Sequence, residues 1–259
     1  MDNACIIGYG IVGRATALQF GITRHIDVSD NNISLEDAAK CRYVFLCLPT
    51  PTNNGKQDAE IIEAYIKKIV GLSSVGRTPL FIIRSTVIPG TARRIMEAVG
   101  ISSVVSNPEF LTESKWESDA KHPSIVVIGS DNPQHGDALA GVYESRWKGI
   151  QLYRTDTITA ETTKYALNTF FATKVIFANR LFDICQDIKA NYETIRQVLE
   201  FYPEGSKNHF TIWHKGGRGA GGRCLSKDLD AFSSHFGDEF FLKVLQLNKE
   251  LLEKYPKTT

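Results

Sequence analysis

A glycine-rich turn near the N-terminus constrains the fold of this chain most strongly. Gly8-Tyr9-Gly10-Ile11-Val12-Gly13 follows the apolar run Cys5-Ile6-Ile7 and precedes a helical pattern from Arg14 to Phe20. In a Gly-x-Gly-x-x-Gly turn between a strand and a helix, the glycines allow a tight bend, close approach of a pyrophosphate and close packing of the helix. The helix N-terminus adds N–H groups and a positive dipole. We therefore expect all six residues of this turn to contact a dinucleotide.

Strands and helices alternate through the first half of the sequence. This alternation predicts a parallel sheet covered by helices on both faces, that is, an α/β Rossmann-like domain over residues 1–156. The expected strands are Cys5-Ile6-Ile7, Ile26 to Val28, Tyr43 to Leu48, Leu80 to Ile83, Val104-Val105 and Ile125 to Ile128.

The pattern changes near Thr157, and helices dominate the rest of the chain. A run from Thr159 to about Lys189 lacks proline and glycine, and its aromatic residues recur at helical spacing, which predicts one long helix. Further helices are expected at Tyr192 to Phe201 and at Lys227 to Lys254, on either side of a glycine-rich loop. We expect a mostly helical domain over 157–259, joined to the first domain by the long helix. Such a helix also favours a homodimer formed through residues 159–189.

The overall composition excludes several classes of protein. A net charge of +1 argues against nucleic acid or anionic membrane as a partner, and no apolar run is long enough to span a membrane. The N-terminus does not resemble a signal peptide. The five cysteines include no Cys-x-x-Cys pair, which favours a reducing cytoplasm over a disulfide framework. The six histidines show no metal-binding spacing, so we expect no metal.

An acidic residue at the end of the second strand should hold the ribose of the dinucleotide. Asp30 fits best because Ile26 and Val28 alternate toward it, and Asp27 is the second candidate. A carboxylate at this place favours NAD over NADP, since it would repel a 2′-phosphate.

Four further segments, taken in order, resemble those of the UDP-glucose/GDP-mannose dehydrogenase family. With the first glycine turn and the long helix, the resemblance covers nearly all of the chain. The most specific segment is the last, which is similar to the family's Gly-x-Gly-Gly-x-Cys-x-x-Lys-Asp loop. The four segments are Leu46 to Pro51, Arg84 to Thr91, Ser106 to Glu113 and Gly219 to Asp228.

The resemblance implies a two-step oxidation of a primary alcohol to a carboxylate with two NAD, as in the conversion of UDP-glucose to UDP-glucuronate. The intermediate aldehyde is captured by a cysteine as a thiohemiacetal, which is oxidised to a thioester and then hydrolysed. A thiol that readily becomes a thiolate is required. Cys224 lies in the glycine-rich loop, between the cations Arg223 and Lys227, and is the expected nucleophile. The alternative is a structural loop cysteine.

Other catalytic residues follow from the same resemblance. Lys164 and Asn168 lie four residues apart on the long helix and match the Lys and Asn that hold the reacting oxygen, although such a pair alone would indicate a solvated helix face. Glu109 matches the base for thioester hydrolysis, and Asp228 and Thr86 match the residues that position the water. Glu113 is expected one helical turn beyond Glu109. The alternative for these acids is helix capping, and for Asp228 a favourable interaction with a helix dipole.

The resemblance also assigns residues to the cofactor and the substrate. Besides the glycine turn and Asp30, the expected cofactor contacts are Thr50, Pro51, Thr86, Glu113 and Lys227. The expected substrate contacts are Phe110, Leu111, Lys164, Asn168, Gly219 and Gly221.

The sequence departs from the family pattern in three places. No segment resembles the third domain with which the family helps to bind UDP, and only Asn31 to Arg42 separate the second and third strands. The segment Phe201 to Gly205 lacks the arginine that reaches the sugar of a neighbouring subunit. Lys207 and Arg218 are the candidates to replace that arginine.

Two other hypotheses follow from these departures. The 3-hydroxyacid dehydrogenases share a glycine-turn domain, a long helix and a Lys/Asn pair, but perform one oxidation without a cysteine. Alternatively, the chain binds NAD and needs a UDP-binding domain supplied in trans.

Overall fold

The computed structural model describes residues 1, 3–28, 30–202, 211–221 and 224–256, which group into two compact units. The first unit contains Met1–Pro51 and Gln57–Lys164, and the second contains Thr52–Lys56 and Tyr165–Thr259. The sequence places the domain division at residue 156, whereas the compact units divide inside the long helix that begins there.

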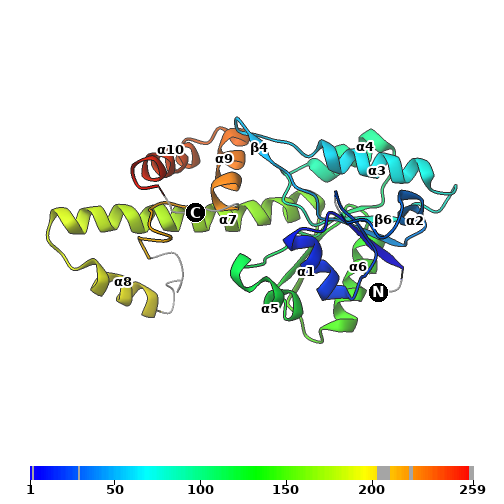
Figure 1. The fold of residues 1–259 in the computed structure, drawn as a ribbon, viewed down its shortest axis with the longest axis horizontal. Helices are drawn as coiled ribbons and strands as arrows, with labels where there is room; N and C mark the ends of the chain where they lie inside the picture. Colours follow the sequence, from blue (N-terminus) through cyan, green and yellow to red (C-terminus); the bar gives the residue numbers. More distant parts are fainter. Residues whose placement is uncertain (2, 29, 203–210, 222–223, 257–259) are drawn as a thin grey trace. The chain divides into compact units, whose positions relative to one another are not determined.

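Within the described residues, seven strands of the first unit form one sheet in the order β2-β1-β3-β6-β7-β8-β9 (Figure 1). The strands are β1 (Ala4–Ile7), β2 (His25–Ile26), β3 (Tyr43–Leu46), β6 (Leu80–Ile83), β7 (Val104–Ser106), β8 (Val126–Gly129) and β9 (Leu152–Thr155). The predicted parallel pairing is confirmed from β2 through β7.

The parallel pairing does not extend to β8, which runs antiparallel to β7 and parallel to β9. An antiparallel neighbour starts at the sheet edge where the previous strand ends. The connection over residues 107–125 therefore stays at the edge that also carries the glycine turn. This connection contains the segment in which Glu109 lies.

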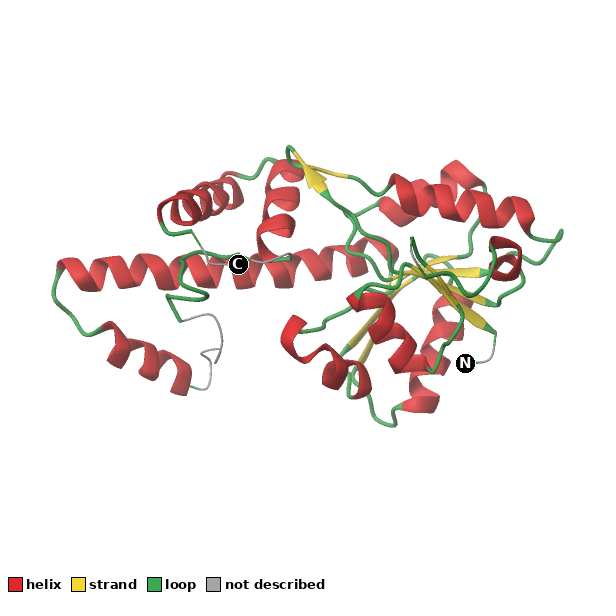
Figure 2. Cartoon of the chain, viewed as in Figure 1, coloured by secondary structure: helices red, strands yellow, loops and turns green. Residues whose placement is uncertain are grey.

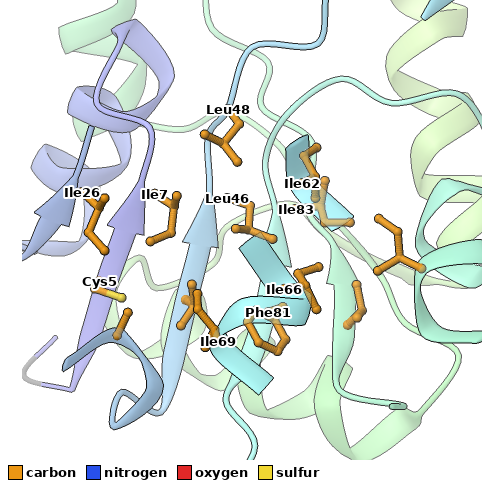
Figure 3. Packing of buried hydrophobic residues seen from close by; sticks show 14 of the residues in the cluster. Cys5, Ile7, Ile26, Leu46, Leu48, Ile62, Ile66, Ile69, Phe81 and Ile83 are labelled. Carbon is orange, nitrogen blue, oxygen red and sulfur yellow. The ribbon is translucent and has the colours of Figure 1, made fainter. Parts of the chain in front are cut away.

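Alternate residues of each strand point to opposite faces of the sheet, and helices cover both faces. On one face, strand residues pack against α2 (Leu35–Ala39), α3 (Glu60–Leu72) and α4 (Thr91–Val99), and α3 contributes Ile62, Ile66 and Ile69 at helical spacing (Figure 3). On the other face, Ile6, Phe45 and Ile82 pack against α1 (Ile11–Phe20) and α6 (Pro133–Arg146). The short helix α5 (Trp116–Lys121) lies next to α1.

A helix of 31 residues, α7 (Thr157–Asp187), continues into the second unit without interruption (Figure 2). It confirms the predicted long helix, and α8 (Tyr192–Phe201) confirms the next one. In the second unit, Ala172 and Ile176 of α7 pack against α9 (Leu225–Phe236) and α10 (Glu239–Lys254). No helix of the described residues is both long and apolar enough to cross a membrane.

The helical region predicted from Lys227 to Lys254 is confirmed, and it consists of two helices, α9 and α10. Gly237 ends α9 in a left-handed conformation with φ of 64°. Asp238 then caps α10 by accepting hydrogen bonds from the N–H groups of Phe240 and Phe241. A glycine followed by a capping acid ends one helix and starts another.

A hairpin absent from the sequence prediction joins β4 (Thr52–Asn53) and β5 (Lys56–Gln57). Its central residues Asn54 and Gly55 both have positive φ, as this two-residue turn requires. In the second unit the tip packs on α9, where a Cβ atom at Gly55 would lie 2.4 Å from Ser234 Oγ.

Candidate active site

The glycine turn has the geometry that a pyrophosphate needs. A Cβ atom at Gly8 would lie 2.5 Å from the Cys47 carbonyl oxygen, and one at Gly13 would lie 2.1 Å from the Gly8 carbonyl oxygen. At Gly10, in contrast, a Cβ atom would meet nothing within 4 Å. Among the described residues, no side chain caps the N-terminus of α1, which begins at Ile11. The first-turn N–H groups therefore fit a phosphate ligand.

The two candidate ribose acids occupy different positions. Asp27 follows β2 directly, and β2 is tied to the glycine turn by a 2.8 Å hydrogen bond from Gly8 N to Ile26 O. Asp30 lies three residues later, with its carboxylate 3.2 Å from His25 Nε2. The His25 ring in turn stacks on Tyr9, with ring centroids 3.8 Å apart.

Thr50 and Thr86, which are both expected to contact the cofactor, lie next to each other. Thr50 Oγ1 donates a 2.8 Å hydrogen bond to the carbonyl oxygen of Thr86. Gln57 bonds the same segment twice, donating to the Thr86 oxygen at 3.0 Å and accepting from Ile88 N at 2.8 Å. The side chains of Thr50 and Gln57 therefore fix the backbone at Thr86. Pro51, the other expected cofactor contact in this segment, is exposed.

In the first unit, Glu109 and Lys164 form a buried ion pair. Lys164 Nζ lies 3.0 Å from Glu109 Oε1, and the two side chains are 7% and 10% exposed. The other Glu109 oxygen accepts a 2.6 Å bond from Leu111 N, and the Phe110 ring lies 5.8 Å from Lys164 Nζ. A solvated helix face is therefore excluded for Lys164.

The expected helical turn between Glu109 and Glu113 is wrong. Residues 107–112 have no regular structure, and Glu113 is an exposed residue that begins a short 3₁₀ helix, Glu113–Lys115. The residue before a proline disfavours helical backbone, and Asn107 precedes Pro108.

Asn107 fixes the start of this irregular segment. Its side chain accepts hydrogen bonds from Arg84 at 2.8 Å and Tyr143 at 2.7 Å, and donates to the Val127 carbonyl oxygen at 2.8 Å. All three polar side chains are buried. A cavity of about 180 Å³ in the first unit is lined by these residues and by Glu109 and its neighbours.

In the second unit, Asp228 links two other predicted site residues. It accepts a 2.5 Å hydrogen bond from Asn168, and its second oxygen lies 2.5 Å from Lys227 Nζ. Asp228 is 1% exposed and lies in the first turn of α9, so the dipole interaction named as its alternative role is also available. Cys224 is the exposed N-cap residue of the same helix.

The loop before Cys224 is held by α10. Asn248 of α10, which is 1% exposed, accepts a 2.7 Å bond from Ala220 N and donates a 2.9 Å bond to Ala220 O. Gly219 has φ of +89° and packs against the same helix. Position 219 therefore requires glycine for a structural reason, independently of any contact with a substrate. Gly221 is half-buried, and Gly222 and Arg223 lie outside the described residues.

Arg218 is not available to replace the missing sugar-binding arginine, so that hypothesis is wrong. Its guanidinium bonds Asn179 at 2.9 Å and Asp183 at 2.8 Å and lies 4.7 Å from the centre of the Tyr255 ring. Only 2% of Arg218 is exposed. Lys207, the other candidate, lies outside the described residues.

Each of the two buried contacts, one at Glu109 and one at Asp228, includes a residue of α7. Lys164, bonded to Glu109, lies in the first unit, and Asn168, bonded to Asp228, lies in the second. Sequence reasoning missed the role of Asn248. Asn248 could have been found as a polar residue in line with the apolar Val244 and Leu245 of α10.

The glycine turn and the doubly covered sheet define a dinucleotide-binding protein of the Rossmann class with a helical second unit. Two domain models of one family match the chain. Residues 28–147 match the NAD-binding domain, and residues 158–250 match the central domain, of the UDP-glucose/GDP-mannose dehydrogenase family. The chain belongs to this family.

Individual relatives agree with this assignment. A UDP-glucose 6-dehydrogenase of Rickettsia conorii is 29% identical over 244 residues, covering 90% of this chain and 54% of the relative. One from Bacillus subtilis is 31% identical over 225 residues, covering 81% of this chain and 49% of the relative. The chain spans about half the length of these curated relatives.

Solved structures show the same fold. A UDP-glucose dehydrogenase from Pyrobaculum islandicum matches with a TM-score of 0.79 and 25% identity, covering 95% of this chain and 68% of that one. A 3-hydroxyisobutyrate dehydrogenase from Mycobacterium tuberculosis matches with a TM-score of 0.73 and 14% identity, covering 97% and 94%. At that identity the second likeness concerns the fold alone.

Proposed function

We propose that this chain oxidises the primary alcohol of a nucleotide sugar to a carboxylate, with UDP-glucose as the first candidate substrate. The balanced reaction is R–CH₂OH + 2 NAD⁺ + H₂O → R–COO⁻ + 2 NADH + 3 H⁺. The curated relatives named UDP-glucose 6-dehydrogenase support this choice of substrate.

When bound, NAD supplies the acceptor for each hydride. The chain holds the pyrophosphate with the N–H groups at the start of α1, next to the open position at Gly10. Asp27 is the better candidate for the ribose, because it follows β2 directly whereas Asp30 is engaged with His25. Thr50 and Thr86 would line the cofactor further along the sheet edge, and Glu113, exposed at the start of its 3₁₀ helix, would be a further contact.

Cys224 provides the nucleophile for the aldehyde formed in the first oxidation. Its position at the N-terminus of α9 stabilises a thiolate through the helix dipole. The thiolate sulfur bonds to the aldehyde carbon, and the electron pair of the C=O bond moves to oxygen. Lys164 and Asn168 stabilise that oxygen by charge and by an N–H donor. Loss of hydride from the same carbon then leaves the thioester.

Hydrolysis of the thioester needs a base and an oriented water. Glu109 removes a proton from the water, whose oxygen bonds to the acyl carbon while the C–S bond breaks and the thiolate leaves. Asp228 and Thr86 accept hydrogen bonds from that water or direct its approach. The buried position of Glu109 beside Lys164 limits its contact with bulk solvent.

The observation that carries this proposal is that each unit holds one of the expected acids in a buried contact with an expected oxyanion donor. Lys164 is bonded to Glu109 in the first unit, and Asn168 is bonded to Asp228 in the second.

The test is the stoichiometry of NADH release from UDP-glucose, with other UDP- and GDP-sugars in parallel. We expect about two NADH per sugar, because the thiohemiacetal is oxidised before release. Cys224→Ala should abolish the second NADH, whereas the matched thiol removal Cys185→Ala, at a buried position, should keep both. Absence of NADH with every sugar would refute the proposal.

The competing hypothesis is a single oxidation that uses no cysteine. Only the fold likeness to the 3-hydroxyisobutyrate dehydrogenase bears on it. If Cys224→Ala keeps full turnover with one NADH per substrate, the single-oxidation mechanism is correct.

We also propose that the chain forms a homodimer through α7. Three apolar side chains recur on one face of this helix at spacings of seven residues, and all are about half exposed: Phe170, Phe177 and Ile184. Contiguous exposed apolar side chains mark association surfaces, and a repeat of seven suits packing between two helices.

Sedimentation tests the dimer. Phe177→Glu should convert dimer to monomer by burying a charge in the interface, whereas Gln186→Glu introduces the same charge at an exposed polar position of α7 and should leave the dimer intact. A wild-type chain that sediments as a monomer at all accessible concentrations would contradict the proposal.

A further inference from the structure

Glu161 is a buried acid of the first unit that the proposed reaction does not use. It lies in the N-terminal part of α7, and only 3% of its surface is exposed. Its carboxylate accepts hydrogen bonds from Gly90 N at 2.6 Å, Ala92 N at 3.0 Å and Ser106 Oγ at 2.9 Å. These bonds join α7 to the start of α4 and to the end of β7.

The bonds of Glu161 lead directly to the buried ion pair. Ser106 ends β7 and stands three residues before Glu109. Glu161 itself stands three residues before Lys164, close to one helical turn away on α7. Any shift of α7 along β7 would break the bond between Glu161 and Ser106 and would also separate Lys164 from Glu109.

We infer that Glu161 is a positioning residue, whose carboxylate holds α7 in register with β7 and so sets the contact between Lys164 and Glu109. The inference of a role in turnover rests on the proposed function. The mechanical coupling of Glu161 to the ion pair rests on the hydrogen bonds alone.

The ionisation of Glu161 controls this contact. Burial raises its pKa to about 7, against the opposing effect of its hydrogen-bond donors. A protonated carboxyl has lost its negative charge and part of its acceptor capacity, so its bonds to the N–H groups of Gly90 and Ala92 are weakened.

The charged groups near Glu161 are already paired. Arg93 of α4 interacts with it electrostatically and is held by Asp131 at 2.7 Å and Asp156 at 3.6 Å. Lys164, on the same helix as Glu161, is paired with Glu109. The carboxyl of Glu161 is therefore the group expected to change the register of α7 near neutral pH.

Nuclear magnetic resonance of the lysine side chains tests the coupling without any substrate. The Lys164 Cε signal, assigned by its loss in Lys164→Arg, is followed from pH 5.5 to 9. We expect a step with its midpoint near the pKa of Glu161, about 7, which disappears in Glu161→Gln. The exposed Glu97→Gln on α4 is the matched control and should keep the step. A signal without a step, or a step that persists in Glu161→Gln, overturns the inference.

If Glu161→Gln does not fold, the substitution Ser106→Ala provides a second test with the same Lys164 signal. It removes one donor that lowers the pKa of Glu161, so the step should move to higher pH. An unchanged midpoint would show that the step belongs to another group and would overturn the inference.

Turnover of UDP-glucose separates the inference from the proposed function. If wild-type protein turns over, Glu161→Gln should lower kcat by about tenfold or more with little change in KM, since reacting groups are displaced rather than removed. An unchanged kcat in that variant overturns the positioning role. A Lys164 step in a chain that oxidises no nucleotide sugar would instead support the coupling and refute the proposed function.

Discussion

Replacing Glu161 by glutamine should change the pH dependence of stability in a defined direction. Burial raises the pKa of this carboxyl from its ordinary 4.5 to about 7, so the folded protein binds the proton more tightly than the unfolded chain. The stabilisation by that proton is complete below about pH 4.5 and is lost as the pH rises through about 7. At about 1.4 kcal/mol per pKa unit, the whole change is about 3 kcal/mol. Relative to Glu161→Gln, the wild-type free energy of unfolding should fall by this amount across the window.

Urea unfolding followed by tryptophan fluorescence measures this difference. A Trp213→Phe background leaves Trp116 and Trp147, which both lie in the first unit with Glu161. Glu97→Gln at an exposed position should show no such pH-dependent difference from wild type. A difference between wild type and Glu161→Gln that stays flat, or that rises with pH, would refute the assignment of a raised pKa to a buried Glu161.

Three further substitutions, the first with a matched control, test individual contacts. Gly13→Ala places a methyl group 2.1 Å from a backbone oxygen and should abolish NAD binding in calorimetry, whereas Gly71→Ala, which meets nothing within 4 Å on α3, should stabilise the protein by about 1 kcal/mol. Asn248→Ala leaves both Ala220 backbone groups without their side-chain partner and should cost about 2 kcal/mol in urea unfolding. Arg218→Lys loses the planar fork and should lower the melting temperature while KM for UDP-glucose changes by less than about twofold; a large rise in KM would contradict its structural role.

Much of the first unit could be predicted because its signals are local. The glycine turn and five parallel strands follow from runs of apolar residues and from turn chemistry, and the structure has them at or near the expected positions. The antiparallel pairing of β8 could not be predicted, because strand direction depends on the path of the connection rather than on the strand sequence. The short polar edge strand β9 gave no apolar run to detect.

The residues of the candidate site also differ in whether the sequence alone could predict them. The motifs identified Lys164, Glu109, Asn168 and Asp228, and the structure brings each acid to its partner. Side chains that act through tertiary hydrogen bonds, such as Asn248, carry no local signal. Their partners lie many residues away, and only the folded chain brings them together.

Mass spectrometry of the Cys224 peptide during turnover tests the central claim most directly. Glu109→Gln removes the base for hydrolysis, so the thioester should accumulate when this variant is mixed with NAD and UDP-glucose. We expect a UDP-glucuronyl adduct on Cys224 that hydroxylamine discharges, and no adduct in Glu109→Gln carrying Cys224→Ala. Turnover by wild-type protein at one NADH per sugar, with no adduct trapped on Cys224 in the variant, would contradict the account.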